Sequence, residues 1–419
     1  MKVVHLSTSD MGGAGIAAKN LHLKLTQFQW DSSMVTKFKL GIDFVEHFCT
    51  QPNQDKRVQR SLFQRIKASL QYRIPMLFPT KEFSLVGRES GFEYFSLPFS
   101  DLKLKSIPLI HKADVIHLHW ISDQFVDYQK VFELNKKYVW TLHDMNPFTG
   151  GCHHSDGCML FDSNCSKCFQ LKGTQNETYS KKILEYKLEA LSNLRDDQMK
   201  IVAPSEWLLN LSKKSACFSR FEHIHIPNVI DFNVEGADRA MSRKAWLLGE
   251  SEIVFLFVAH DVRNTRKGMG TLIHAFENLP NKSNLVLMVL GQTSGLILEG
   301  VRVVELGFVT DQSVLRNAYL AADVFLMPSI AENFPNTIVE SLLMGTPVIA
   351  SSVGGIPEQV NETNGVLVLS HDHEAWTNGL SYFAQNKHHF NRANIARDAM
   401  EKYNSGRITE EYIKVYHSL

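Results

Sequence analysis

The chain has 419 residues, of which 44% are hydrophobic and 21% are charged, so it is long enough for two or three globular domains. Its 44 basic and 44 acidic side chains give a formal net charge of zero, and no overall positive field favours nucleic acid as a partner. No apolar run reaches the roughly 18 residues of a membrane-spanning helix. The apolar stretch at the amino terminus is too short for a secretory signal, so we expect a cytoplasmic protein.

Short, continuous apolar runs alternate with longer segments of helical periodicity along most of the chain. Continuous apolar runs are typical of parallel strands that helices cover on both faces. Two series of such runs predict an α/β fold with two doubly wound, Rossmann-like domains. The predicted strands are residues 2–8, 32–39, 114–120, 138–144 and 200–205, followed by 253–261, 285–291, 301–308, 323–329, 347–351 and 366–369.

We place the boundary between the two domains after residue 229. Residues 225–233 have the pattern of an extended linker, in which Pro227 restricts the residue before it. The prediction is therefore a first domain of residues 1–229 and a second domain of residues 230–389. Residues 390–419 are expected to form one long helix that packs back across the interface.

The segment MGGAGIAAK follows the first predicted strand and opens a helix. Its Gly12, Gly13 and Gly15 allow the backbone to approach a ligand closely, and helix N-terminal N–H groups favour an anion. A nicotinamide site also needs an acidic residue at the end of the second strand, but Lys37 and Lys39 stand there. The loop is therefore either a plain strand–helix turn or the cradle of a different phosphate ligand.

The most informative stretch is AENFPNTIVESLLMGTPVIASSVGGIPE, residues 331–358. Pro335 suits the first turn of a helix and Gly345 its end, with Glu332 just before the helix and Glu340 within it. Free N–H groups flanked by two carboxylates would suit the phosphates and hydroxyls of a sugar nucleotide. Two glutamates at this spacing also occur by chance in helices.

This stretch resembles the E-x7-E region of the retaining GT-B glycosyltransferases of the "glycosyl transferases group 1" family. The segments GGAG, IVAPSEW, IPNVID, RKG and ADVFLMPS are similar to further family motifs in the same order. The resemblance covers nearly the whole chain and implies a GT-B fold, in which two Rossmann-like domains face each other across a cleft. It implies a retaining, hexosyltransferase-type transfer from a UDP-, GDP- or ADP-sugar to a glycan or lipid-linked saccharide, without a catalytic metal or other cofactor.

The resemblance also assigns roles on the donor side. Glu332 would hold hydroxyls of the donor sugar, Glu340 would accept hydrogen bonds from the ribose, and Lys267 would neutralise the leaving diphosphate. The family commonly has an arginine where this chain has Asp261, so either Arg266 or Arg263 assists Lys267, or Lys267 acts with less help. The remaining expected donor contacts are Phe334, Pro335, Asn336, Thr337 and Glu358, with Gly12, Gly13 and Gly15 lining the cleft from the first domain.

A histidine-rich group is expected on the acceptor side. Thr141-Leu142-His143 matches a T-x-H that the family places near the donor sugar, so His143 joins Glu332 and Lys267 as a catalytic candidate. Asp144 would orient this imidazole or touch an acceptor hydroxyl. His117 and His119 alternate on one strand and point to the same face, where they are either core residues or, for His119 in particular, part of the acceptor side. No protein base is assigned.

Four cysteines lie close together in the sequence, at Cys152, Cys158, Cys165 and Cys168. The C-x2-C end is a common zinc hairpin, and four thiolates suit a structural zinc ion. Free thiols and disulfides remain alternatives, and His153 or His154 could replace a cysteine. HDMNPFTGGC followed by further cysteines resembles a subgroup that acts in bacterial surface-polysaccharide assembly.

Residues 54–81 are basic and amphipathic. They could form a helix that contacts an anionic inner membrane peripherally, or a helix that packs on its own domain with a solvated basic face. Two other functions also remain open for the whole chain. One is a nucleotide-sugar epimerase on the same scaffold, and the other is a non-catalytic sugar-nucleotide-binding partner.

Overall fold

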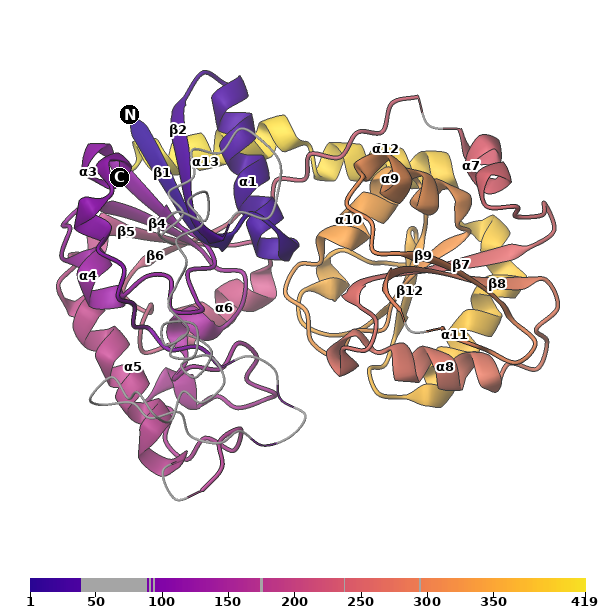
Figure 1. The fold of residues 1–419 in the computed structure, drawn as a ribbon, viewed down its shortest axis with the longest axis horizontal. Helices are drawn as coiled ribbons and strands as arrows, with labels where there is room; N and C mark the ends of the chain where they lie inside the picture. The colour runs from indigo at the N-terminus through magenta and orange to yellow at the C-terminus, as the bar shows by residue number, and fades with distance from the viewer. Residues whose placement is uncertain (39–88, 90–91, 93–94, 174–175, 237, 294) are drawn as a thin grey trace, which may run out of the picture. The chain divides into compact units, whose positions relative to one another are not determined.

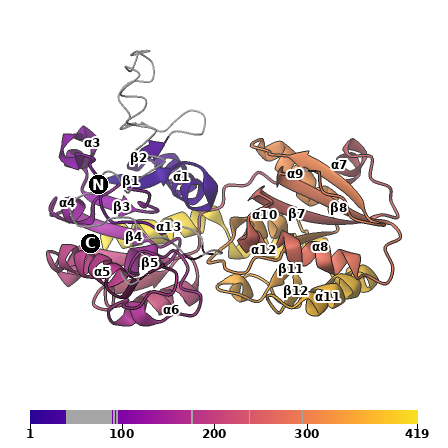
Figure 2. The same ribbon diagram turned by 60° about the horizontal axis from the view of Figure 1, so that its bottom comes forward.

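The computed structural model describes residues 1–38, 89, 92, 95–173, 176–236, 238–293 and 295–419. This part of the chain forms two compact units, each built on a six-stranded sheet with helices beside it (Figure 1, Figure 2). Unit 1 consists of Met1–Val202, Asn210–Ile224 and Val415–Leu419, and unit 2 of Ala203–Leu209 and His225–Lys414.

In the sheet of unit 1, the second strand lies on one side of the first strand and the third strand lies on the other side. Its order is β2 (Asp31–Phe38), β1 (Lys2–Ser9), β3 (Val115–Leu118), β4 (Lys137–Thr141), β5 (Met199–Ala203) and β6 (Glu222–His225). The chain leaves β1 toward β2 on one side and then crosses to β3 on the other, with β1 parallel to both. Right-handed crossovers therefore put helices on both faces, and the carboxyl ends of β1 and β3 border the crevice where such sheets bind ligands.

The sheet of unit 2 has the same kind of topology. Its order is β12 (Gly365–Val368), β11 (Val348–Ser351), β10 (Val324–Met327), β7 (Ile253–Asp261), β8 (Leu285–Gln292) and β9 (Arg302–Gly307), and the recorded pairs are parallel. Strands β8 and β9 lie on one side of β7, and the chain then crosses to the other side, where β10 pairs with β7. The loops after β7 and β10 therefore meet at the switch point of the sheet.

The helices connect these strands and bury the faces of the sheets. Val324, Phe325 and Leu326 of β10, for example, are fully buried. The α-helices in the described residues are α1 (Gly12–Gln27), α3 (Pro108–Lys112), α4 (Tyr128–Phe132), α5 (Asn176–Ser192), α6 (Glu206–Lys214), α7 (Arg239–Ala245), α8 (Met269–Glu277), α9 (Gln312–Ala321), α10 (Asn336–Leu343), α11 (His373–Asn386), α12 (Arg392–Lys402) and α13 (Ser405–His417). No helix in the described ranges has both the length and the hydropathy to cross a bilayer.

The predicted strands are all present, and two local expectations are wrong. The sequence analysis missed β6, because its residues EHIH are polar and only partly buried and so give no apolar run. The expected single helix over 390–419 is two helices. The side chain of Asn404 accepts a hydrogen bond from the N–H of Arg407 at 2.9 Å and so starts α13 as a separate helix. The basic segment 54–81 and Lys39 lie outside the described residues.

Candidate functional site

The loop after β7 in unit 2 is held against the end of β10. It contains the short 3-10 helix Thr265–Lys267, whose backbone oxygen at Arg266 accepts from the N–H of Ile330 at 2.9 Å. The next residue, Gly268, has a φ of +78°, and a Cβ there would collide with the carbonyl oxygen of Pro328. The glycine of the RKG motif therefore allows the two basic residues before it to approach the segment that follows β10.

Glu332 lies in that segment and pairs with both basic side chains. Its Oε1 is 2.6 Å from Nζ of Lys267 and 3.0 Å from Nη1 of Arg266, and its side chain is 12% exposed. Burial of the Glu332 carboxyl raises its pKa, but the charges of Lys267 and Arg266 outweigh this effect and lower it to about 2. The carboxylate is thus ionised at neutral pH and lies at the switch point of the sheet.

A pair of glycines fixes the backbone of Glu332 from the other side. Gly354 has a φ of +56°, and a Cβ there would collide with the carbonyl oxygen of Glu332, while a Cβ at Gly355 would collide with that of Asn333. The hydroxyl of Ser205 donates to Oδ1 of Asn333 at 2.5 Å. The glycines of SVGGIP are therefore needed because this turn packs directly on the carboxylate loop.

Helix α10 begins as predicted, with Pro335 at its N-cap, and the chain turns after it at Gly345 with a φ of +69°. Within the helix, Glu340 accepts a hydrogen bond from the hydroxyl of Tyr319 at 3.1 Å. Burial raises the pKa of Glu340 to about 7, although the Tyr319 hydrogen bond opposes the shift. The two predicted carboxylates therefore differ in charge near neutral pH, because only Glu332 has cations beside it.

Two of the expected donor-side residues are engaged elsewhere in the structure. Arg263 pairs with Asp261 through two contacts of 3.0 Å and is two-thirds exposed, so Arg266 is the arginine that joins Lys267 at Glu332. The carboxylate of Glu358 accepts the N–H groups of Glu206 and Trp207, each at 2.8 Å, at the start of α6. The sequence analysis missed Tyr319, which no local motif marks, and it gave no role to Ser205, although this residue lies in the IVAPSEW motif.

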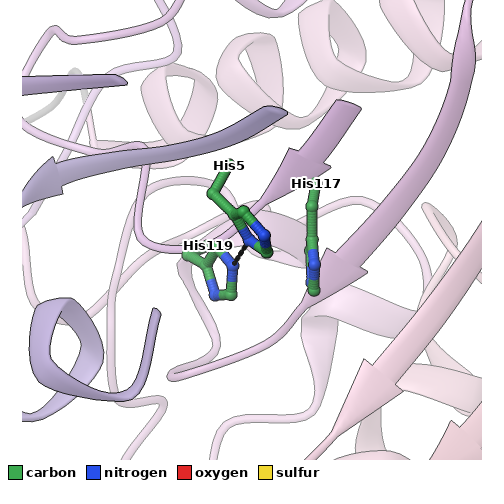
Figure 3. Close-up of side chains that lie close together, drawn as sticks. All are labelled: His5, His117 and His119. Carbon is green, nitrogen blue, oxygen red and sulfur yellow. Dashed lines mark hydrogen bonds between the residues drawn. The ribbon is translucent and has the colours of Figure 1, made fainter. Parts of the chain in front are cut away.

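Unit 1 contains a chain of three histidines, of which His5 and His119 are buried and His143 is partly buried. Nδ1 of His5 is 3.0 Å from Nε2 of His119, and Nδ1 of His119 is 3.2 Å from Nε2 of His143. Figure 3 shows the His5–His119 contact. His5 lies on β1, and His117 lies beside it on β3, the strand that His119 directly follows. Each neutral imidazole has one N–H, so the bonds along this chain must all run in the same direction. His5 was missed because a single histidine in an apolar strand carries no distinguishing pattern.

The hydrogen bonds of His117 and His119 indicate which of their two predicted roles, core residue or acceptor contact, they fill. His117 is bonded to the Tyr416 hydroxyl and to Oγ1 of Thr141, both at 2.8 Å, and its ring stacks on that of His119. The two side chains share a face of the strand, as predicted. The ligand atoms of His5, His117 and His119 lie within 4.8 Å of one another, but both ring nitrogens of His117 and of His119 have partners. This suits a hydrogen-bonded core better than a metal site.

His143 and Asp144 lie just after the end of β4. Burial lowers the pKa of His143 to about 4, with the charge of Asp144 opposing the shift, so the imidazole is neutral at pH 7. The carboxylate of Asp144 contacts Nδ1 of His153 at 2.6 Å and accepts from Nε1 of Trp120 at 2.7 Å. Burial raises the pKa of Asp144, but the His153 contact outweighs it and lowers the pKa to about 2. Asp144 is thus an ionised acceptor fixed by two rings.

The three glycines of the first loop have different surroundings. A Cβ on Gly15 would collide with the backbone of Ser9 and Asp10, so this glycine lets α1 pack on the end of β1. Gly12 and Gly13 are exposed, and a Cβ on either would meet no described heavy atom within 4 Å. Only Gly12 and Gly13 therefore remain candidates for contact with a ligand, although the sequence analysis gave this role to all three.

None of the four clustered cysteines forms a disulfide, and all four are partly buried. Burial raises the pKa of Cys152 to about 12 and that of Cys165 to about 11, so both thiols are protonated at neutral pH. His153, considered above as a substitute ligand, is bonded through its other nitrogen to the hydroxyl of Ser96 at 2.8 Å. Both of its ring nitrogens are therefore occupied away from the cysteines.

Residues 252–386 match the family model described as glycosyl transferases group 1. The matched segment contains the Glu332–Lys267–Arg266 cluster, the glycine pair and Glu340. The chain carries a glycosyl transferases group 1 domain. This domain lies within unit 2 and includes all six strands of its sheet.

Curated proteins similar in sequence to this chain are also named as glycosyltransferases. The chain is 28% identical over 327 residues to an uncharacterized glycosyltransferase, MJ1607, of Methanocaldococcus jannaschii, covering 73% of this chain and 76% of that protein. It is 25% identical over 320 residues to the putative colanic acid biosynthesis glycosyl transferase WcaC of Escherichia coli, covering 74% and 77%.

Solved GT-B glycosyltransferases share the fold over the whole chain. Sucrose-phosphate synthase from Thermosynechococcus elongatus superposes with a TM-score of 0.62 at 17% identity, covering all of this chain and 98% of the other. Anabaena HepE, solved in complex with UDP, superposes with a TM-score of 0.60 at 17% identity over all of both chains. The fold is therefore GT-B, as predicted.

Proposed function

We propose that the protein is a retaining glycosyltransferase that moves a sugar from a nucleotide diphosphate-sugar to a glycan or lipid-linked saccharide in polysaccharide biosynthesis. The observation that carries this proposal is the ionised Glu332 held by Lys267 and Arg266 at the switch point of the group 1 domain. A sugar nucleotide offers two phosphates to the cations and sugar hydroxyls to the carboxylate.

The proposed reaction uses each of these groups at the bond that breaks. The bond between the anomeric carbon and the diphosphate oxygen breaks, and Lys267 and Arg266 stabilise the negative charge that develops on the leaving group. Glu332 accepts hydrogen bonds from the sugar and stabilises positive charge at the anomeric carbon. The acceptor oxygen attacks from the same face, and its proton passes to the leaving phosphate, so no protein base is required.

We assign His143 and Asp144 to the reaction from unit 1. A neutral imidazole can donate or accept a hydrogen bond at a sugar hydroxyl without bringing a positive charge to an electron-poor anomeric carbon. Asp144, ionised and fixed by His153 and Trp120, offers an acceptor for a hydroxyl of the incoming saccharide. The exposed backbone at Gly12 and Gly13 would approach the diphosphate at the N-terminus of α1.

The nature of the substrates is inferred by likeness. WcaC is named as a colanic acid biosynthesis enzyme, which supports a saccharide acceptor in surface-polysaccharide assembly. HepE has been solved with UDP-glucose bound, which makes UDP-sugars the first donors to test, ahead of GDP- and ADP-sugars. We further propose a cytoplasmic enzyme with peripheral contact at the inner membrane, where lipid-linked acceptors are found.

The decisive experiment is a screen of UDP-, GDP- and ADP-sugars by thermal shift, followed by product analysis. We expect one donor to raise the melting temperature and to be slowly hydrolysed, with the released sugar initially in the donor's anomeric configuration by NMR. Addition of Mg²⁺ or Mn²⁺ should leave turnover unchanged. An epimerised nucleotide sugar would identify an epimerase, and binding without turnover for any acceptor tried would identify a non-catalytic binding partner. An inverted anomer would contradict the retaining mechanism.

A further inference from the structure

The clustered cysteines surround a single small cavity in unit 1. Cys152, Cys158, Cys165 and Cys168 all line it, together with apolar neighbours such as Phe95 and Phe161. Its volume is about 20 Å³, which is the space of a single water-sized sphere. Four sulfurs from a stretch of 17 residues around an atom-sized space form the donor set of a tetrathiolate metal site.

A buried ammonium group lies near these thiols, and no described carboxylate is in direct contact with it. The side chain of Lys187 is fully buried, and its Nζ donates to the carbonyl oxygens of Asn146 and Thr149. Within the described ranges, no carboxylate oxygen lies within 4.0 Å of this Nζ. A buried cation is costly without a compensating charge, and Cys217, Cys152, Cys165 and the carboxylate of Asp144 all interact with it electrostatically. Four thiolates around a divalent ion carry a net charge of −2, which Lys187 would partly balance.

Backbone geometry at the cavity also favours sulfur as a ligand. The N–H of Gly150 donates to Sγ of Cys165 at 3.1 Å, an interaction that stabilises a thiolate. A Cβ at Gly150 would collide with the carbonyl oxygen of Ser180 and would lie 2.9 Å from Cβ of Cys165. The glycine therefore permits the close approach that this hydrogen bond needs.

The four thiols lie farther apart than sulfurs that share a metal ion. Tetrahedral Zn–S bonds of about 2.3 Å place sulfurs about 3.8 Å from one another. Among the described residues, the three histidines of Figure 3 are the only group whose metal-ligand atoms all lie within 4.8 Å. Metal binding would thus draw the sulfurs closer together and tighten residues 150–168.

We propose that Cys152, Cys158, Cys165 and Cys168 bind one structural Zn²⁺ ion. Thiolates in a tetrahedral set select zinc or an iron–sulfur cluster, and an atom-sized cavity has room for a single ion. Each thiol gives up its proton to solvent when it binds the ion, and no redox change is involved. Four protein ligands leave no open position, so the ion holds structure and takes no part in sugar transfer.

The zinc site also has a defined effect on the acceptor side. Cys152 immediately precedes His153, whose Nδ1 holds the carboxylate of Asp144 at 2.6 Å. Fixing Cys152 in a metal site therefore fixes the ring that positions Asp144. This consequence concerns loop geometry and is measurable without any donor or acceptor.

The test is metal analysis of the full-length protein purified in reductant without added zinc. We expect one zinc per chain, released stoichiometrically when a mercurial reagent titrates the thiols. Replacement by Co²⁺ should give the intense visible band of a tetrahedral tetrathiolate. Cys158→Ser and Cys168→Ser should each lose the metal and gain reactivity of the remaining thiols toward Ellman's reagent. Cys217→Ser, at a buried cysteine that does not line the cavity, should keep one zinc per chain.

Several results would overturn the proposal. Wild-type protein with well under one zinc per chain, and with the cavity thiols reacting freely in the native state, has no such site. Disulfides among the four cysteines under native purification would also refute it, as would iron with the absorption of an iron–sulfur cluster. Since these readouts use the wild-type protein, misfolding of a variant cannot hide the answer.

Discussion

Replacement of Glu332 by glutamine should abolish sugar transfer and yet tighten the binding of the free nucleoside diphosphate. In the structure, the carboxylate of Glu332 forms ion pairs with Lys267 and Arg266, the two cations that would otherwise bind the diphosphate. The shift of its pKa from 4.5 to about 2 corresponds to about 3 kcal/mol of stabilisation of the ionised form. If a third of this energy, about 1 kcal/mol, becomes available to the ligand, affinity rises about fivefold. Turnover should fall at least about 100-fold, since charge at the reaction centre is no longer stabilised.

The assay is calorimetric titration of wild type and Glu332→Gln with the nucleoside diphosphate of the preferred donor, at low and high salt. The affinity gain should shrink at high salt, because it comes from charge. Glu362→Gln removes the same charge at an exposed position of the same unit and should change neither affinity nor turnover. Diphosphate binding that weakens in a folded Glu332→Gln protein would refute the view that Lys267 and Arg266 serve the diphosphate.

Three further predictions follow from individual residues. The pKa of Glu340 in the folded protein is raised to about 7, so its neutral form stabilises the fold fully below pH 4.5. This stabilisation is lost as the pH rises through 7. Thermal melts at pH 6 and pH 8 should therefore show the loss in the wild type and not in Glu340→Gln. If the ribose requires the ionised form, donor affinity of the wild type should rise up to about tenfold between pH 6 and pH 8, and an unchanged affinity would separate Glu340 from the ribose. Gly13→Val should reduce turnover more than stability, whereas Gly15→Ala should lower the melting temperature; equal loss of both at Gly13 would make the loop a plain turn. The pKa of His143, lowered to about 4, predicts a single neutral tautomer between pH 5.5 and 8 in ¹⁵N-histidine NMR spectra, and a titration in that range would contradict the buried chain through His119.

The fold could be predicted from the sequence because its signals are local. Continuous apolar runs such as IVFLFVAHD and LVLMVLG need only their own side chains to become buried parallel strands, and both are present as expected. Pro335 and Gly345 likewise mark the limits of α10 through their own backbone preferences. Where the local signal was weak, at the polar edge strand β6 and at the break near Asn404, the prediction failed.

Which side chains work together was decided by the tertiary structure. Lys267 and Glu332 are 65 positions apart and meet because β7 and β10 are neighbours at the switch point of their sheet. In the same fold, Arg263 forms an ion pair with Asp261, and Glu358 accepts a hydrogen bond at the start of α6. In the sequence, both residues are as plausible for donor binding as Arg266 and Glu332. Residue types and their spacing thus determined the elements and the kind of chemistry. Burial and the partners brought by distant strands determined which carboxylate is ionised, because charge depends on neighbours that the local sequence does not contain.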